Sequence, residues 1–347
     1  MPFTPDFSNA SIRLTQVSST LFKPQYDMPF TGPESTAYYV GDGCQLSYRW
    51  HDAFDVFIAT LEVKVADARK PITLPVSSHL SDLHLVYQLV GRSRFVPIKE
   101  NVKPEVGLDE GHYFAAYTPP ASSVLQIEPD PKSRGFAMVA CVPKSAWLTR
   151  HRHPKPSPME ALIGCLRQKH AEHQLIQPAP ITPPIRAWLH LLLTTSPRPG
   201  LLMDDALHHP TAHLVEQHRM ECARAGRADD EHALAMATRQ LVQSLVSRLD
   251  GDKLLTVSEL AAVMQVRPKT VRSAHQRFYG SSLDAYIYEQ LMVRAKTMLD
   301  GGMTIKAVSL TLGYSTQNNF SRSFKKQYGI SPSDYQKNIP SENIPPA

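Results

Sequence analysis

Donor-rich side chains recur on one face of a short segment near the C-terminus of this 347-residue chain. Five polar or basic residues of this segment fall at helical spacing: Gln317, Asn318, Arg322, Lys325 and Lys326. Amide and guanidinium groups can hydrogen-bond to base edges in a DNA major groove, and lysines can neutralise phosphates. Phe320 and Phe324 lie four residues apart and would pack inward. The pattern predicts a helix that reads double-stranded DNA with one face.

A shorter helix is expected to precede this reading helix and to fix its direction. Apolar residues repeat at helical spacing over residues 305–312, and Gly313 can take the positive φ that ends such a helix. Ser315 or Thr316 can cap the helix that follows. Residues 305–325 therefore predict a complete helix-turn-helix.

A second unit of the same kind spans residues 256–278. Thr256 and Glu259 have the spacing of a capping box, and Pro268 suits the first turn of the following helix. Apolar residues at helical spacing from Leu283 to Leu299 predict one continuous connecting helix. Two DNA-reading helices joined by such a helix would have a fixed separation.

Residues typical of one family of DNA-binding domains recur through the stretch 231–337: Leu260, Ala261, Gly280, Arg294, Ala295, Ile305, Gly313, Tyr314, Phe320, Phe324, Lys325, Gly329, Ser331, Pro332 and Tyr335. Through these residues the stretch resembles the C-terminal DNA-binding domain of the AraC/XylS family of bacterial transcription regulators. The resemblance implies seven helices and two helix-turn-helix units within residues 231–338. By analogy with the family, the base-reading residues would be Lys269, Arg272 and Ser273 in the first unit, and Gln317, Asn318 and Arg322 in the second.

One position departs from the family pattern in a way that matters. His275 stands where the family usually buries a phenylalanine, and a buried polar ring needs a partner or packs poorly. We therefore expect the first unit to be the looser reader. Substitutions in the second reading helix should then be the more damaging ones.

Charge is concentrated in the same region. Residues 231–338 hold fourteen lysines and arginines against eight acidic residues, a net +6, whereas the whole chain carries +5. The remainder therefore sums to −1, so the basic character coincides with the motifs, as phosphate binding requires. No apolar run approaches the roughly 20 residues of a membrane span, and no signal peptide is apparent, which predicts a cytoplasmic protein without membrane association.

Residues 37–142 are strand-like, with short β-branched or aromatic runs at 54–65, 83–90, 113–117 and 123–127 separated by turns. They predict an antiparallel β barrel or sandwich, so the whole chain is expected to be α+β. The layout resembles the cupin-like sensor domain that many AraC-family members place first. Helices are expected at 159–175, 183–194 and 211–225, which either build a dimer interface, as the family implies, or only cover the barrel's own core.

The expected domains are residues 1–228, for effector sensing and dimerisation, and residues 231–338, for DNA binding, followed by a tail at 339–347. Aromatic and polar residues in or beside the strands could line a pocket for an organic effector: Tyr48, Trp50, His84, Tyr87 and Tyr117. The alternative for each of these residues is an ordinary place in the core.

Catalytic and metal chemistry has little support. The single His-x-His pair lies at 151–153 in a proline-rich stretch, and Pro210 interrupts the spacing between His209 and His213. The four cysteines, Cys44, Cys141, Cys165 and Cys222, form no Cys-x-x-Cys pair and read as reduced thiols. No serine elbow or phosphate-binding glycine loop is present, so we expect no enzyme, no cofactor and no metal.

The sequence thus predicts an effector-responsive transcription regulator, a homodimer that acts as an activator together with RNA polymerase. Two alternatives stay open. One is a cupin-type metalloenzyme that carries a DNA-binding tail, and the other is a regulator whose first domain binds a partner protein instead of a small molecule.

Overall fold

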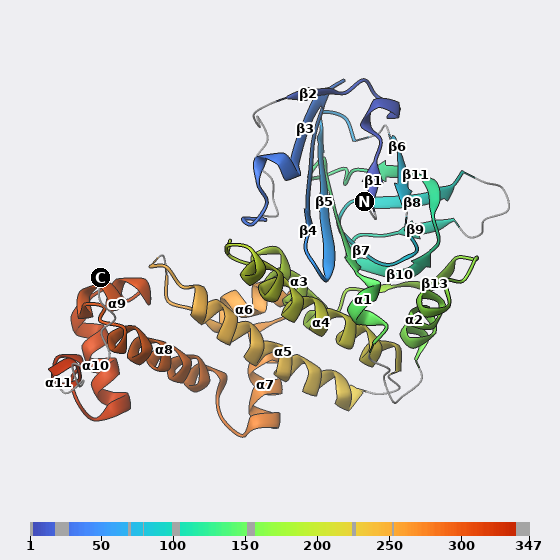
Figure 1. The fold of residues 1–347 in the computed structure, drawn as a ribbon. Helices are drawn as coiled ribbons and strands as arrows, with labels where there is room; N and C mark the ends of the chain where they lie inside the picture. The colour runs from blue at the N-terminus through green and yellow to red at the C-terminus, as the bar shows by residue number, and fades with distance from the viewer. Residues whose placement is uncertain are drawn as a thin grey trace. The chain divides into compact units, whose positions relative to one another are not determined.

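The computed structural model describes residues 3–17, 28–68, 71–78, 80–98, 105–150, 157–223, 227–251 and 253–337. The chain divides into two compact units (Figure 1). The first comprises Met1–Ile185 with Leu192–Arg224, and the second comprises Arg186–Leu191 with Ala225–Ala347.

The first unit is built on two antiparallel sheets (Figure 1). The smaller sheet has the order β1 (Thr4–Pro5), β6 (Ile72–Ser78), β11 (Ala121–Glu128), β8 (Arg92–Pro97) and β9 (Val106–Leu108). The larger sheet has the order β13 (Gln174–Pro180), β10 (His112–Thr118), β7 (Asp82–Val90), β12 (Gly135–Pro143), β5 (Val56–Val65), β4 (Cys44–Asp52), β3 (Thr36–Gly41) and β2 (Thr15–Val17). The α+β class and the four strand segments predicted from the sequence are confirmed.

The core lies between the two sheets. Alternate residues of β5, from Phe57 to Val65, belong to one apolar cluster with Leu74 of β6 and Leu125 of β11. The intervening residues of β5 face the other side, where all but Lys64 are also buried, including the polar Thr60 and Glu62. Both faces of β5 are therefore largely covered, one by the apolar cluster and the other by different surroundings.

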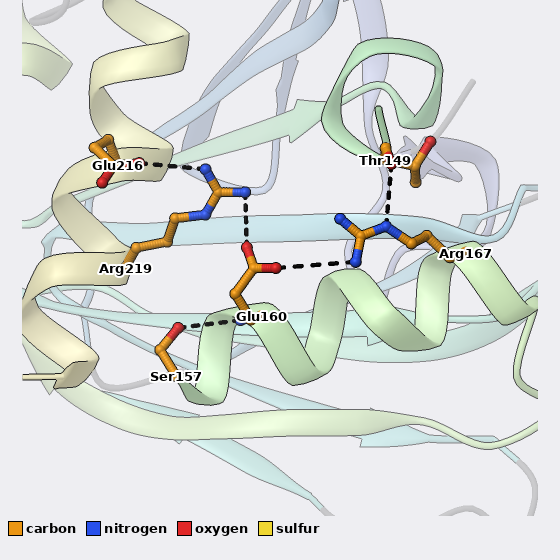
Figure 2. A network of polar contacts seen from close by, with 6 residues as sticks. All are labelled: Thr149, Ser157, Glu160, Arg167, Glu216 and Arg219. Atoms are coloured by element: carbon orange, nitrogen blue, oxygen red, sulfur yellow. Dashed lines mark hydrogen bonds and ion pairs between the residues drawn. The ribbon is translucent and has the colours of Figure 1, made fainter. Parts of the chain in front are cut away.

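The first unit also contains the helices η1 (Phe7–Asn9), η2 (Pro33–Ser35), α1 (Ser145–Leu148), α2 (Pro158–Gln168) and α4 (Leu201–Ala223). Helix α3 (Pro183–Leu193) is divided between the two units, with Arg186–Leu191 in the second. A charged network holds α2 to α4, as Figure 2 shows. Arg219 of α4 forms an ion pair with Glu160 of α2, with Nη2 and Oε1 2.8 Å apart, and Arg167 lies 3.9 Å from the other carboxylate oxygen. All three side chains are less than a fifth exposed, so removal of one partner would leave a poorly solvated charge.

Two helix predictions in this part of the chain were wrong. The helix expected at 159–175 ends at Gln168, because Lys169 takes a left-handed conformation (φ 49°), and β13 follows from Gln174. β13 is an edge strand, where prolines that lack an N–H are tolerated. The helix expected from Thr211 instead begins at Leu201 and continues through Pro210. Its buried Leu207, Leu214 and Val215 provide apolar burial that offsets the roughly 3 kcal/mol that an interior proline costs.

The second unit contains the helices α5 (Arg227–Arg248), α6 (Val257–Met264), α7 (Pro268–Tyr279), α8 (Leu283–Asp300), α9 (Ile305–Thr311), α10 (Gln317–Tyr328) and α11 (Pro332–Lys337). They are the seven helices expected from the sequence, and α8 matches the expected connecting helix. No described helix of the chain is long and apolar enough to cross a membrane. Cys44, Cys141 and Cys165 are free thiols, and the Cys222 side chain lies outside the described residues.

Candidate nucleic-acid interface

Helix α10 is fixed by two buried aromatic rings and by a capped first turn. Phe320 and Phe324 are fully buried, and the Thr316 hydroxyl accepts a hydrogen bond from the Asn319 amide at 3.2 Å. The opposite face leaves five side chains exposed: Gln317, Asn318, Arg322, Lys325 and Lys326. The structure thus brings all the predicted donors of this helix together on one solvent-facing surface.

The turn before α10 depends on a glycine. Gly313 has φ 78°, and a Cβ built there would lie 2.4 Å from the carbonyl carbon of Lys253 and 2.5 Å from the amide nitrogen of Leu254. Both atoms belong to the backbone that leads into α6. The positive φ predicted for Gly313 is confirmed, and the glycine also lets two backbone segments of the domain approach each other.

Helix α7 has the same construction in the first helix-turn-helix. The capping box of Thr256 and Glu259 opens α6, Gln265 turns the chain in a left-handed conformation, and Pro268 starts α7. Val271 and Ala274 are buried. Lys269, Arg272 and Ser273 are exposed, as a base-reading role requires.

The expectation of loose packing at His275 was wrong. The ring is fully buried and both nitrogens have partners: Nδ1 donates to the Ser281 carbonyl at 2.9 Å, and Nε2 accepts from Nε of Arg239 at 3.3 Å. Burial lowers the pKa of His275, and the neighbouring Arg239 lowers it further, so the ring is neutral. Arg239 also stacks over the rings of Tyr279 at 3.4 Å and Tyr286 at 4.4 Å. The physical reason for ranking the first reader as the weaker one is therefore removed.

Helices α7 and α10 both pack against α8. This 18-residue helix packs against α7 at its start and against α10 further along, where the Tyr288 hydroxyl donates to the Ser323 carbonyl. Its buried positions include Leu283, Ile287 and Leu291. Because α7 and α10 rest on the same continuous helix, their separation is set by the fold of this domain.

Arg272 has a partner that sequence reasoning missed. Its Nε and Nη2 donate to the two carboxylate oxygens of Asp284, at 2.9 and 3.3 Å. The pair lowers the pKa of the Asp284 carboxyl, chiefly through the hydrogen bond from Arg272. The available signal was an acidic residue just after the Ser282 cap, one turn beyond the end of α7.

The five residues proposed to line an effector pocket do not meet in one place. Tyr48, Trp50 and His84 lie on the inner face of the larger sheet or beside its core, where Trp50 stacks on Tyr48 with centroids 5.2 Å apart. Tyr87 and Tyr117 point to the opposite face. Their hydroxyls bond to His218 Nε2 at 2.8 Å and to the carbonyl of residue 170 at 2.7 Å.

A metal site has no support among the described residues. Among the described residues no group of three histidine, cysteine or acidic side chains is arranged to hold an ion. The His-x-His pair at 151–153 lies outside those residues. The argument that Pro210 separates His209 from His213 was wrong, since α4 is continuous and the two rings lie 4.5 Å apart.

Residues 260–338 match a protein family described as a helix-turn-helix domain. An uncharacterised HTH-type transcriptional regulator of Mycobacterium bovis is 28% identical over 140 residues, which cover 40% of this chain and 39% of the relative. YtdP of Bacillus subtilis, also an uncharacterised HTH-type transcriptional regulator, is 32% identical over 84 residues, covering 24% of this chain and 11% of the relative.

Among solved structures, the C-terminal domain of AraT, a response regulator from Geobacillus stearothermophilus, is 27% identical with a TM-score of 0.29. The match covers 33% of this chain and 93% of that one. The matched segments thus span well under half the length of the curated relatives. The C-terminal part of this chain is a helix-turn-helix domain of the AraC type.

Proposed function

We propose that this protein is a sequence-specific, DNA-binding transcription regulator in which α7 and α10 read two successive major-groove segments. The observation that carries the proposal is the pair of exposed, donor-rich helix faces mounted on α8. Helix α8 has 18 residues and is therefore about 27 Å long. That length suits two readers placed about one helical turn of DNA, or roughly 34 Å, apart on one side of the duplex.

Selection of bound genomic fragments by the full-length chain tests this function. We expect enrichment of a shared sequence, and affinity that falls steeply with salt because several phosphates are contacted. If no fragment is enriched, or if the affinity for DNA does not change with salt concentration, the proposal is contradicted.

We also propose that the first unit binds a small organic effector. His84 supports this, because its Nε2 is buried on the inner side of the larger sheet and has no hydrogen-bond partner among the described residues. Burial lowers the pKa of His84 to about 4, so the ring is neutral and can accept or donate one hydrogen bond there. A polar atom of an effector would supply the missing hydrogen-bond partner.

A metabolite panel screened by thermal shift, with His84→Phe as the matched variant, tests the effector proposal. A compound that stabilises the parent protein but not the variant is the expected result. Metal analysis of the purified protein addresses the alternative of a metalloenzyme with a DNA-binding tail, and a protein-partner mode of control would be indicated if no compound binds.

Homodimerisation, and activation through RNA polymerase, belong to the same proposal. Helices α2 to α4 are the candidate dimer interface, as in the family that the sequence resembles. Sedimentation of the full-length chain should give the mass of two copies, whereas a monomer at micromolar concentration would contradict this part.

A further inference from the structure

The contact between Arg272 and Asp284 leaves one edge of the guanidinium available. Asp284 accepts from Nε and Nη2, so it approaches Arg272 from the side. An arginine has five N–H donors, and this pairing uses two of them. Both donors of Nη1 and one donor of Nη2 remain, and the far edge presents one N–H of Nη1 and one of Nη2 that can form two parallel hydrogen bonds.

That remaining edge matches guanine. In the major groove guanine presents two acceptors, N7 and O6, and a bidentate arginine is the contact that distinguishes it from the other bases. An unpaired arginine on an exposed helix samples many rotamers and loses that freedom on binding. A side chain that is already held by Asp284 loses less, so the pairing favours the bidentate contact before DNA arrives.

Asp284 is itself held firmly in place. Gly280 ends α7 with φ 68°, Ser282 caps α8 by accepting from the Ala285 amide at 3.2 Å, and Leu283 is fully buried. A carboxylate in the first turn of a helix is further stabilised by the helix dipole. The position of the acid is therefore set by the turn between α7 and α8.

The pair lies on an open surface where DNA could reach it. About half of each side chain is exposed, and both line a groove of about 530 Å³ together with Ser273, Gln276 and Arg277 of α7 and Ser282. The side chains of these neighbours can donate hydrogen bonds, and that of Arg277 carries a positive charge. The surroundings suit a base edge flanked by phosphates.

We propose that Asp284 is a positioning residue that orients Arg272 for bidentate contact with guanine and thereby sets the base preference of α7. This inference rests on the proposed DNA-binding function. It assigns to Asp284 a role in specificity although its charge opposes the phosphates. Loss of the acid should therefore weaken discrimination without weakening non-specific attraction to DNA.

Selection from a randomised DNA pool with the full-length chain tests the inference. For the parent protein we expect guanine at one position of the α7 half-site. Asp284→Ala should reduce the preference for guanine there by about fivefold or more, while affinity for non-specific DNA stays level or rises. Asp284→Asn, which keeps one oxygen acceptor, should give an intermediate preference.

Two controls separate positioning from simple removal of charge. Glu289→Ala removes another exposed acid of α8 and should change affinity for all sequences in the same ratio. Arg272→Ala should abolish the preference by itself, and Asp284→Ala should have no further effect on preference in that background.

The inference is overturned if the parent has no guanine preference at the α7 half-site, if Asp284→Ala keeps that preference, or if Asp284→Ala binds the preferred site more tightly relative to non-specific DNA. The last result would mean that Asp284 competes with DNA for Arg272. A parent protein that enriches no DNA would instead overturn the proposed function itself.

Discussion

Replacement of Gly313 by alanine should destabilise the DNA-binding domain far more than the same replacement at Gly280. Both glycines have positive φ, 78° and 68°, so an alanine at either costs about 1–2 kcal/mol in backbone strain. Only at Gly313 would the new Cβ meet backbone atoms, at 2.4 to 2.7 Å, whereas nothing lies within 4 Å of it at Gly280. Overpacking of that kind costs about 1–3 kcal/mol more. The expected losses are therefore about 2–5 kcal/mol for Gly313→Ala and about 1–2 kcal/mol for Gly280→Ala.

Hydrogen exchange of the full-length protein measures this difference locally. Amides of α9 and α10 should become less protected in Gly313→Ala, because the turn and its contact with residues 253–254 must shift. Gly280→Ala should leave those amides close to their original protection. Equal loss of protection in the two variants would refute the claim that close backbone approach, rather than positive φ alone, requires Gly313.

Three further outcomes are expected. Arg322→Ala should reduce the binding free energy at the specific site by about 1–3 kcal/mol and relax the preference at one base pair, whereas Lys326→Ala should weaken binding to all sequences about equally. Competition binding with specific and random DNA separates the two effects. If both variants kept the parent's ratio of specific to random-DNA affinity, Arg322 would read no base. Affinity for the selected DNA should fall log-linearly with salt, and loss of one phosphate-contacting lysine such as Lys326 should reduce the slope by about one, which titration at several salt concentrations checks. His218 is fully buried against Tyr87, and burial lowers its pKa from 6.5 to about 3. Below about pH 6.5 the imidazole is protonated in the unfolded state but not in the folded state, so the first unit should lose about 1.4 kcal/mol of stability per pH unit as pH falls toward 3. Urea denaturation at pH 7 and pH 5 should show a smaller loss of stability in His218→Gln than in the parent protein.

Local signals in the sequence predicted the DNA-binding domain well. The capping box of Thr256 and Glu259, the turn at Gly313 and the spacing of Phe320 and Phe324 each involve residues within a few positions of one another. Such features are decided by backbone geometry and by which face of a helix is apolar. They do not depend on distant parts of the chain.

Contacts between distant residues could not be predicted in the same way. Arg239 lies on α5, 36 residues before His275, and no local feature of the sequence indicates that it donates a hydrogen bond to His275 Nε2. β13 exists because β10 offers a free edge, so its residues pair as a strand although their spacing suggested a helix. Tertiary contacts outweighed local preference in both cases.

One error in the proposed effector pocket was avoidable. His84 and Tyr87 lie three residues apart on one strand, so the alternation of side chains already places them on opposite faces of the sheet. The sequence could therefore have separated them. It could not have shown that the Tyr87 face is covered by α4, whose His218 accepts or donates the hydrogen bond to the tyrosine hydroxyl.

Footprinting of the full-length protein on a selected fragment tests the two-reader proposal most directly. We predict two protected major-groove segments on one side of the duplex, roughly 34 Å apart. Combined alanine substitutions at Lys269 and Arg272 should remove protection of one segment, and combined substitutions at Gln317 and Arg322 should remove protection of the other. A single protected segment, or two variant sets that affect the same segment, would contradict the proposal that α7 and α10 each read DNA.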